Sequence, residues 1–414
     1  MCRNFLIGGE MILILVLLFS INICAQDFEI KSLKTYSNAN ESSFPIIDYG
    51  DEYQHKITIE FDLDSDYQPF LNIVFKFCDK NWTPYDNIFL VNQGHNVERN
   101  LWYEKLPNNI KGASYHFKKS FPSQDVWFPF SGKWIFYITD NQDENIIYAS
   151  GKFIVVYPGL KLDAKIKKSR LEGENANPST RTITLETSFN MPDSLFSSNI
   201  DEIEIIENQK IYDPVIINRD PYNNYRYYEW DGANRFTFIA KDIFPGNEYR
   251  QVDLRDYNYF NSKKVNANKG GIETPHSNVR YYRDYNGGSV LTNYKSEYAD
   301  YLDVTFKLKM PSDFKRKIFL VGAFNDWDIW YDYELNYNNG IYEISTELKR
   351  GVYDYQYVTA DEINGSITNL DWTEIEGNNW ETDNEYHVFL YYKEPERGNY
   401  DRLLGYIKIL SGGL

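Results

Sequence analysis

The sequence predicts an all-β protein made of tandem antiparallel β-sandwich domains of the immunoglobulin-like or early-set kind. Short apolar stretches of near period 2 recur along the chain, and clusters of Asn, Asp, Gly and Pro, which favour turns, separate them. No stretch after the first 25 residues keeps an apolar helical period over several turns. Because sandwiches bury one face of many short strands, we expect this architecture.

The N-terminus carries an apolar run that is typical of a secretory signal. The run covers residues 11–23, and the polar mature sequence begins after Ala25, so we predict that residues 1–25 are a signal peptide. It is shorter than the roughly 20 apolar residues that span a bilayer. Two alternatives stay open, namely lipidation of Cys24 and a start of translation at Met11. The mature chain is therefore expected to lack a transmembrane segment.

The strands are predicted from apolar and β-branched stretches between turn signals. In chain order, they are residues 57–63, 70–77, 133–139, 152–156, 183–187, 203–206, 235–239, 304–308, 318–321, 340–344, 351–357 and 387–392.

Three blocks of sandwich size follow the signal peptide. The sequence Tyr157-Pro158-Gly159 punctuates the chain and predicts the first boundary. We expect an N-terminal sandwich over residues 26–158, a middle sandwich over 159–298 and an early-set-like C-terminal sandwich over 299–414. A polar stretch at residues 263–277 predicts a mobile loop within the middle block.

The composition limits the classes of function. The formal charge of −17 argues against nucleic-acid binding, which requires a basic surface. In the mature chain Cys78 is the single cysteine, so no intrachain disulfide can form. With 42% hydrophobic and 17% aromatic residues, burial is expected to stabilise the fold.

Residues 318–327 form the most informative local pattern. A buried-strand signal at residues 318–321 runs directly into Gly322, which permits close backbone approach. We expect Asn325-Asp326 to bond its own backbone in a turn, and Phe324 and Trp327 to anchor this turn by burial.

No motif in the sequence supports catalysis or a cofactor. Asp62, Asp64 and Asp66 resemble the start of a calcium loop, but Tyr67 stands where glycine is required, so a solvated turn is the favoured interpretation. The five histidines are scattered, and the chain has no HExxH, CxxC or G-x-S-x-G pattern. We therefore predict no metal, no cofactor and no enzymatic activity.

Residues 246–253 gather polar side chains at a predicted strand start. Asn247, Glu248, Arg250 and Asp253 could form a recognition site. We favour a structural role in which Arg250 pairs with Glu248 or Asp253, because the guanidinium fork suits carboxylates.

The nine tryptophans leave a second functional hypothesis open. Exposed members of the set could stack on glycans, but burial is expected for each, since most large aromatic residues of sandwiches belong to the core.

Several stretches together resemble the plug protein family of the type IX secretion system. They cover nearly the whole mature chain in order: residues 75–84, 245–250 with Asp253, 284–287, 298–301, 322–327, 376–378 and 400–405. Within them we single out motif residues that are expected to be structural: Trp82, Asn247, Glu248, Arg250, Asp253, Gly322, Phe324, Asn325, Trp327, Asp401 and Arg402.

The resemblance implies a periplasmic, non-enzymatic protein that is associated with the outer membrane. Such a protein docks on the periplasmic opening of the giant outer-membrane β-barrel translocon and occludes it. The alternative is a carbohydrate-binding β-sandwich protein of the cell envelope, because residues 318–358 also resemble glycan-binding sandwiches.

Replacement of Trp327 by Ala is expected to lower the free energy of unfolding of the C-terminal sandwich by about 3–5 kcal/mol, because truncating a buried aromatic side chain leaves a cavity. Denaturant unfolding of the variant beside the wild type measures this difference. Lost partner binding with unchanged stability would contradict the structural role of Trp327.

Overall fold

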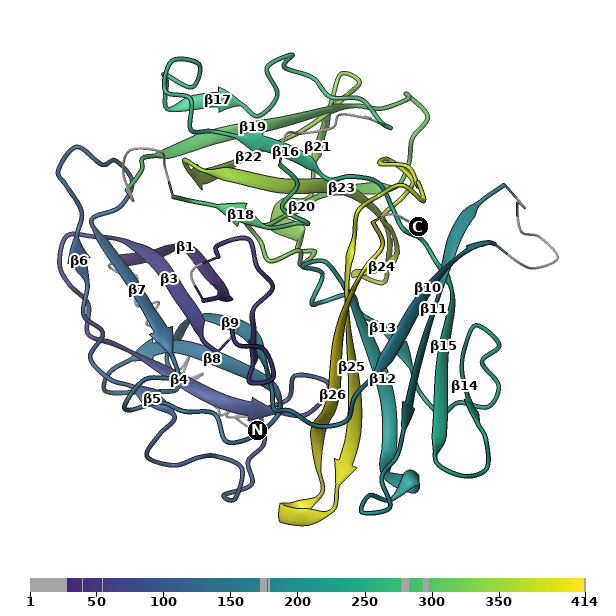
Figure 1. Ribbon diagram of the computed structural model, residues 1–414. Coiled ribbons are helices and arrows are strands. Elements are labelled where there is room, and N and C mark those ends of the chain that lie inside the picture. The colour runs from purple at the N-terminus through teal and green to yellow at the C-terminus, as the bar shows by residue number, and fades with distance from the viewer. Residues whose placement is uncertain are drawn as a thin grey trace, which may run out of the picture.

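The computed structural model describes residues 28–412, apart from residues 39, 54, 172–176, 178, 277–282 and 293–297. Within this part the prediction of an all-β fold is confirmed, since the chain forms β-strands and only three short 3-10 helices (Figure 1). The predicted signal peptide and Cys24 lie outside the described residues. None of the described helices has the length and apolar character needed to cross a membrane.

The first sandwich consists of two sheets formed by residues 28–156. One sheet has the order β1 (Phe28–Ser37), β3 (Ile57–Ser65), β7 (Tyr115–Phe121) and β6 (Glu104–Lys105). The other has the order β2 (Ile46–Asp48), β9 (Ile147–Val156), β8 (Gly132–Asp140), β4 (Leu71–Cys78) and β5 (Val97–Glu98). All pairs are antiparallel except β2 with β9, which is parallel.

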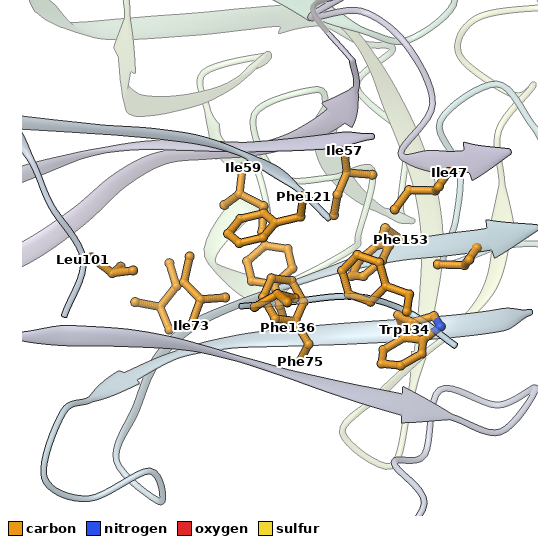
Figure 2. Packing of buried hydrophobic residues seen from close by; sticks show 14 of the residues in the cluster. Ile47, Ile57, Ile59, Ile73, Phe75, Leu101, Phe121, Trp134, Phe136 and Phe153 are labelled. Carbon is orange, nitrogen blue, oxygen red and sulfur yellow. The ribbon is translucent and has the colours of Figure 1, made fainter. Parts of the chain in front are cut away.

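Aromatic side chains fill the space between these two sheets (Figure 2). The ring of Phe75 lies 4.9 Å from that of Phe121 in an edge-to-face arrangement, which aromatic pairs prefer. Trp134 is fully buried, and its Nε1 donates a 3.0 Å hydrogen bond to Phe130 O. Cys78 at the end of β4 is buried as a free thiol, so burial without a disulfide stabilises the described part of this sandwich.

The second sandwich is assembled from two distant parts of the chain. One sheet has the order β10 (Asp163–Arg170), β11 (Arg181–Asn190), β15 (Arg235–Ile243) and β14 (Arg226–Trp230). The other has the order β13 (Val215–Ile217), β12 (Ile200–Glu207), β25 (Glu385–Glu394) and β26 (Tyr400–Leu410). The two sheets share one hydrophobic core.

The third sandwich lies between these two parts in the sequence. Its first sheet has β23 (Val352–Ile363) at the centre, paired with β16 (Arg250–Asp253), β18 (Ser289–Val290), β20 (Lys317–Gly322) and β24 (Ser366–Asp371). Its second sheet has the order β17 (Lys264–Asn266), β19 (Tyr301–Lys309), β22 (Ile341–Lys349) and β21 (Asn336–Asn338). The third sandwich is therefore an insertion into the second.

This connectivity differs from the expected domain boundaries. Residues 250–290 contribute β16, β17 and β18 to the third sandwich, although we assigned them to the middle block. Strands β25 and β26 complete the second sandwich, although we assigned them to the C-terminal block. The reason is physical: the apolar period of a strand reports which face is buried, but it does not report which other strand supplies the pairing partner.

Each predicted strand overlaps an observed one, with ends that differ by a few residues. The polar stretch from residue 263, which we predicted to be a mobile loop, contains residues that pair with a neighbouring strand. Within it, β17 pairs in parallel with β19, and Glu273 forms a bridge to Leu308 and is buried. Residue 277 lies outside the described part.

The three sandwiches form a closed, three-cornered arrangement (Figure 1). The yellow hairpin β25–β26 runs beside the blue first sandwich, and the green third sandwich lies across both of the others. Hydrogen bonds join every pair of sandwiches, as between Lys133 and Glu204, Asp62 and Tyr301, and Asn208 and Tyr249.

Candidate functional site

The interface between the first and second sandwiches contains a buried ion pair. Lys133 Nζ of β8 lies 2.7 Å from Glu204 Oε1 of β12, and the two side chains are 3% and 1% exposed. Lys133 also donates to Lys80 O at 2.6 Å, and Glu204 accepts a 3.0 Å bond from Tyr391 OH. The Trp82 ring covers the ammonium at 4.8 Å. Trp82 is thus a part of this interface.

Asp401 connects the hairpin of the second sandwich to a loop of the first. Its Oδ2 accepts hydrogen bonds from Lys80 N at 3.1 Å and from Tyr85 OH at 3.3 Å. Its backbone N in turn donates to Tyr85 OH at 2.8 Å, and Lys393 pairs with the carboxylate. Arg402 points to its own hairpin, where it pairs with Glu394 at 2.9 Å.

The interface between the first and third sandwiches is centred on Asp62. This carboxylate lies 2.8 Å from Lys349 Nζ and 2.7 Å from His116 Nδ1, and it accepts a 2.8 Å bond from Tyr301 OH. Asp62 and Asp64 belong to strand β3, so the predicted solvated turn is wrong for them. Asp62 is buried because the third sandwich supplies two of its partners, a contact between distant segments that the local sequence does not record.

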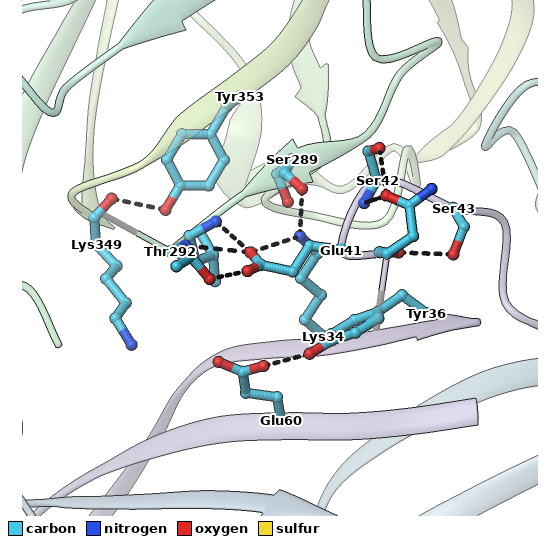
Figure 3. A network of polar contacts seen from close by, with 12 residues as sticks. Lys34, Tyr36, Glu41, Ser42, Ser43, Glu60, Ser289, Thr292, Lys349 and Tyr353 are labelled. Carbon is cyan, nitrogen blue, oxygen red and sulfur yellow. Dashed lines mark hydrogen bonds and ion pairs between the residues drawn. The ribbon is translucent and has the colours of Figure 1, made fainter. Parts of the chain in front are cut away.

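A second polar network supports the same interface (Figure 3). The Glu41 carboxylate accepts hydrogen bonds from the backbone N of Leu291 and Thr292 and from the Thr292 hydroxyl. Lys34 Nζ donates to Ser289 O, so two side chains of the first sandwich hold β18 and the two residues that follow it.

The second and third sandwiches are joined by amide and ring contacts. Asn208 Nδ2 lies 2.8 Å from both Tyr249 OH and Asn384 Oδ1, and Asn384 Nδ2 donates to Pro245 O at 2.7 Å. Trp372 Nε1 donates to Asp213 Oδ2 at 2.6 Å. These bonds fix the two crossings of the chain between the two sandwiches.

Arg250 is the centre of a buried network in the third sandwich. Its Nε lies 2.9 Å from Glu376 Oε2, and its Nη1 lies 3.1 Å from Glu273 Oε1. Tyr355 OH and Tyr357 OH also donate to Glu273. Burial raises the pKa of Glu376 above its ordinary value, and the Arg250 guanidinium opposes that shift.

The expected partners of Arg250 were therefore wrong. Glu248 and Asp253 lie close in sequence, but alternation along β16 directs Arg250 and Val252 into the core and leaves Asp253 exposed, where Arg255 binds it at 2.7 Å. Asn247 supports the network from the side, since its Nδ2 donates to Glu376 O at 2.9 Å.

Glu248 belongs to an acidic pocket of about 180 Å³ together with Asp284, Asp354 and Asp383. Burial raises the pKa of Glu248 to about 7, and the neighbouring charge of Asp284 adds to the shift. Burial likewise raises the pKa of Asp354 to about 7, although Gln251 and Gly287 donate hydrogen bonds to it. The protonated, neutral form of these two carboxyl groups is therefore favoured over the charged form.

The turn after β20 is built largely as the sequence predicted. Gly322 is required, because a Cβ there would lie 2.6 Å from Asp354 O, and Asn325 Oδ1 accepts a 2.9 Å bond from Gly322 N. Trp327 is 2% exposed and donates to Gly287 O at 2.6 Å, while Phe324 packs on the core of the third sandwich.

Asp326 departs from the expectation for this turn. No hydrogen bond joins its carboxylate to its own backbone within the described residues, and it faces a pocket instead. Asp326 and Trp327 both adopt left-handed backbone conformations, with φ of 53° and 60°. Such conformations cost roughly 1–3 kcal/mol each in non-glycine residues, so packing around Trp327 holds the turn in place.

Burial was a wrong expectation for four tryptophans. Trp102, Trp127, Trp230 and Trp330 are between 44% and 81% exposed. They are distributed over all three sandwiches, with two on the first and one on each of the others, so they do not make one continuous stacking platform.

The structure places four of the motif residues at or beside contacts between sandwiches. Trp82 and Asp401 lie at the first contact, whereas Asn247 and Trp327 lie near the chain crossings into the third sandwich. Sequence reasoning missed Lys133, Glu204, Lys349 and Glu273. A signal was present for some of them, because a charged residue inside an otherwise apolar strand stretch requires a buried partner.

Comparison with protein families matches residues 30–157 to the type 9 secretion system plug protein 1st domain. Among solved structures, the chain is similar to a hypothetical protein from Parabacteroides merdae ATCC 43184, with a TM-score of 0.74 and 21% identity. That alignment covers 92% of this chain and 97% of the other, and it shows that the three-sandwich fold is shared. No curated protein matches the chain.

Replacement of Arg250 by Ala is expected to cost about 3–5 kcal/mol of stability, because Glu273 and Glu376 would remain buried without a cation. Denaturant unfolding measures the loss. The matched control is Lys167→Ala, which removes the exposed pair with Glu186 and should cost less than about 1 kcal/mol. Equal losses in the two variants would contradict the role of the buried network.

Replacement of Glu248 by Gln is expected to stabilise the protein by about 1 kcal/mol at pH 8 and to change little at pH 4.5. Because its pKa is raised to about 7, Glu248 lowers stability as pH rises through the window from its ordinary value to about 7. Unfolding at both pH values tests this, with Glu104→Gln on exposed β6 as control. A gain of equal size at both pH values would refute the effect.

Proposed function

We propose that the protein, whose first sandwich matches the type 9 secretion system plug protein 1st domain, docks on the periplasmic opening of the giant outer-membrane β-barrel translocon of that system and occludes it. It acts without catalysis or a cofactor. Its place is the periplasm, in association with the outer membrane.

The observation that carries this proposal is the closed arrangement of the three sandwiches. Each interface contains buried polar groups, such as Lys133 with Glu204 and Asp62 with Lys349. A small rotation at such an interface leaves a buried charge without its partner and without water, which costs about 3–5 kcal/mol. A body whose parts resist rotation against one another can cover a wide opening against diffusing solutes without bending.

The insertion of the third sandwich adds to this stiffness. Two chain crossings, at residues 244–249 and 372–384, connect the second and third sandwiches, and both are held by hydrogen bonds. A domain that is tethered twice rotates less freely than one on a single linker, because each tether removes conformations.

The motif residues take structural roles in this proposal. Trp82 and Asp401 hold the first sandwich to the second, and Arg250 stabilises the third. Release from the translocon then needs only a competing interaction that favours the undocked state.

A capture experiment tests the proposal. The tagged mature chain is incubated with detergent-solubilised outer membranes of a bacterium that has this secretion system, and the bound proteins are recovered. We expect capture to recover one very large β-barrel protein in near-equal amount, as identified by mass spectrometry. An excess of untagged chain is the control and should abolish the recovery.

Absence of the barrel from the captured material would contradict the docking. Retention of the same chain on a polysaccharide column would then favour the carbohydrate-binding alternative. Heat-unfolded chain provides a further control, since capture that survives unfolding would indicate nonspecific adsorption.

A further inference from the structure

A pocket lies where the three sandwiches meet. Its main part has a volume of about 630 Å³ and is lined by β1 and the start of β9, by Tyr212, and by the segment 323–333 of the third sandwich. A smaller part of about 60 Å³ adjoins it and shares Lys34, Tyr212 and Asp326 with it. We call the two parts the junction pocket. Its size is that of pockets for small organic ligands, about 300–1,000 Å³.

Two opposite charges line the junction pocket without forming a pair. Lys152 of β9 and Asp326 of the turn after β20 both border its smaller part. Among the residues that the structure describes, neither side chain has a hydrogen-bond or ion-pair partner, and the two groups are too far apart for a direct salt bridge. Other charges here are matched, since Lys31 pairs with Glu347, and Lys34 lies near Glu41.

The pKa values of both groups are shifted towards the neutral form. Burial lowers the pKa of Lys152 to about 8, and burial, followed by the charge of Asp328, raises the pKa of Asp326 to about 6. Lys152 is half-buried, whereas Asp326 is exposed at the border of the pocket, so its carboxylate is accessible to a ligand. A ligand that covers these charges must supply partners of opposite charge, because a covered and unpaired charge is costly.

The positions of the two charges are fixed by the fold. The left-handed backbone at Asp326 and the buried Trp327 behind it direct the carboxylate into the pocket. Lys152 lies between two rings, 3.7 Å from the centroid of Tyr212 and 5.0 Å from that of Trp82. Each charge therefore occupies a defined place, and the space between them is open to a ligand.

The charges of the residues that line the junction pocket indicate which class of ligand it can bind. The described residues contain no group of three or more His, Cys, Asp or Glu side chains that could hold a metal ion. A simple anion would satisfy Lys152 and be repelled by Asp326 and Asp328, and a simple cation would have the reverse effect. A dipolar molecule satisfies both groups at once. Tyr148, Phe324 and Trp330 add apolar walls for its remaining part.

We propose that the junction pocket binds a small zwitterion of the α-amino acid class, with its ammonium group on Asp326 and its carboxylate on Lys152. Because the walls come from all three sandwiches, the bound molecule strengthens their association.

Thermal unfolding and calorimetric titration of the full mature chain with each of the twenty free L-amino acids at 2 mM test the proposal. We expect at least one to raise the melting temperature and to bind with a Kd below about 0.2 mM. Its amide and its N-acetyl derivative, which each lack one charge, should bind at least tenfold more weakly. If none of the twenty binds, the proposal is overturned.

Two variants assign the contacts. Asp326→Asn keeps a residue that tolerates a left-handed backbone, and Lys152→Met keeps most of the side-chain volume. Each variant should bind the amino acid at least tenfold more weakly than the wild type does. The affinity of Asp326→Asn for the N-acetyl derivative should equal that of the wild type. Lys167→Met on the exposed face of the second sandwich is the matched control. Equal affinity in all three variants would overturn the site, and if a variant does not fold, the comparison of the charge-deleted probes decides.

Discussion

The pairing of β12 with β25 is the constraint on which the rest of the structure depends. It brings residues 385–392 beside residues 200–207, and so returns the end of the chain to the second sandwich. The segment between them is thereby closed into an insertion and forms the third sandwich. The same hairpin presents Asp401 to the first sandwich and places Phe389 and Leu403 in the apolar cluster between the first two sandwiches.

Buried charges then decide how the sandwiches fit together. Apolar contact alone is tolerant of small rotations, because it depends mainly on area. A buried pair such as Lys133 with Glu204 is not tolerant, since displacement leaves each group without water and without a partner. The interfaces thus combine an apolar cluster with directional bonds, and the geometry of the whole body follows from both.

The third sandwich carries most of the unusual chemistry of the molecule. Arg250 neutralises two buried glutamates there, whereas Glu248 and Asp354 lie among other carboxylates and bind protons at unusually high pH. The strained turn at Asp326 and Trp327 faces the other two sandwiches. This turn lies at the meeting point of the three sandwiches, where a small change in packing or charge affects all of them.

The sequence by itself determined the all-β class, the positions of twelve of the strands, the burial of Trp327 and the turn at Gly322, because hydrophobic periodicity, turn-forming residues and aromatic content are local properties of the sequence. Only the tertiary structure decided that β25 and β26 complete the second sandwich, that Arg250 pairs with Glu273 and Glu376, and that Lys152 and Asp326 face one pocket. The alternation along a strand records which side chains are buried, but the partner of each depends on packing between distant segments, such as those of Lys80 and Asp401, which lie 321 residues apart in the sequence.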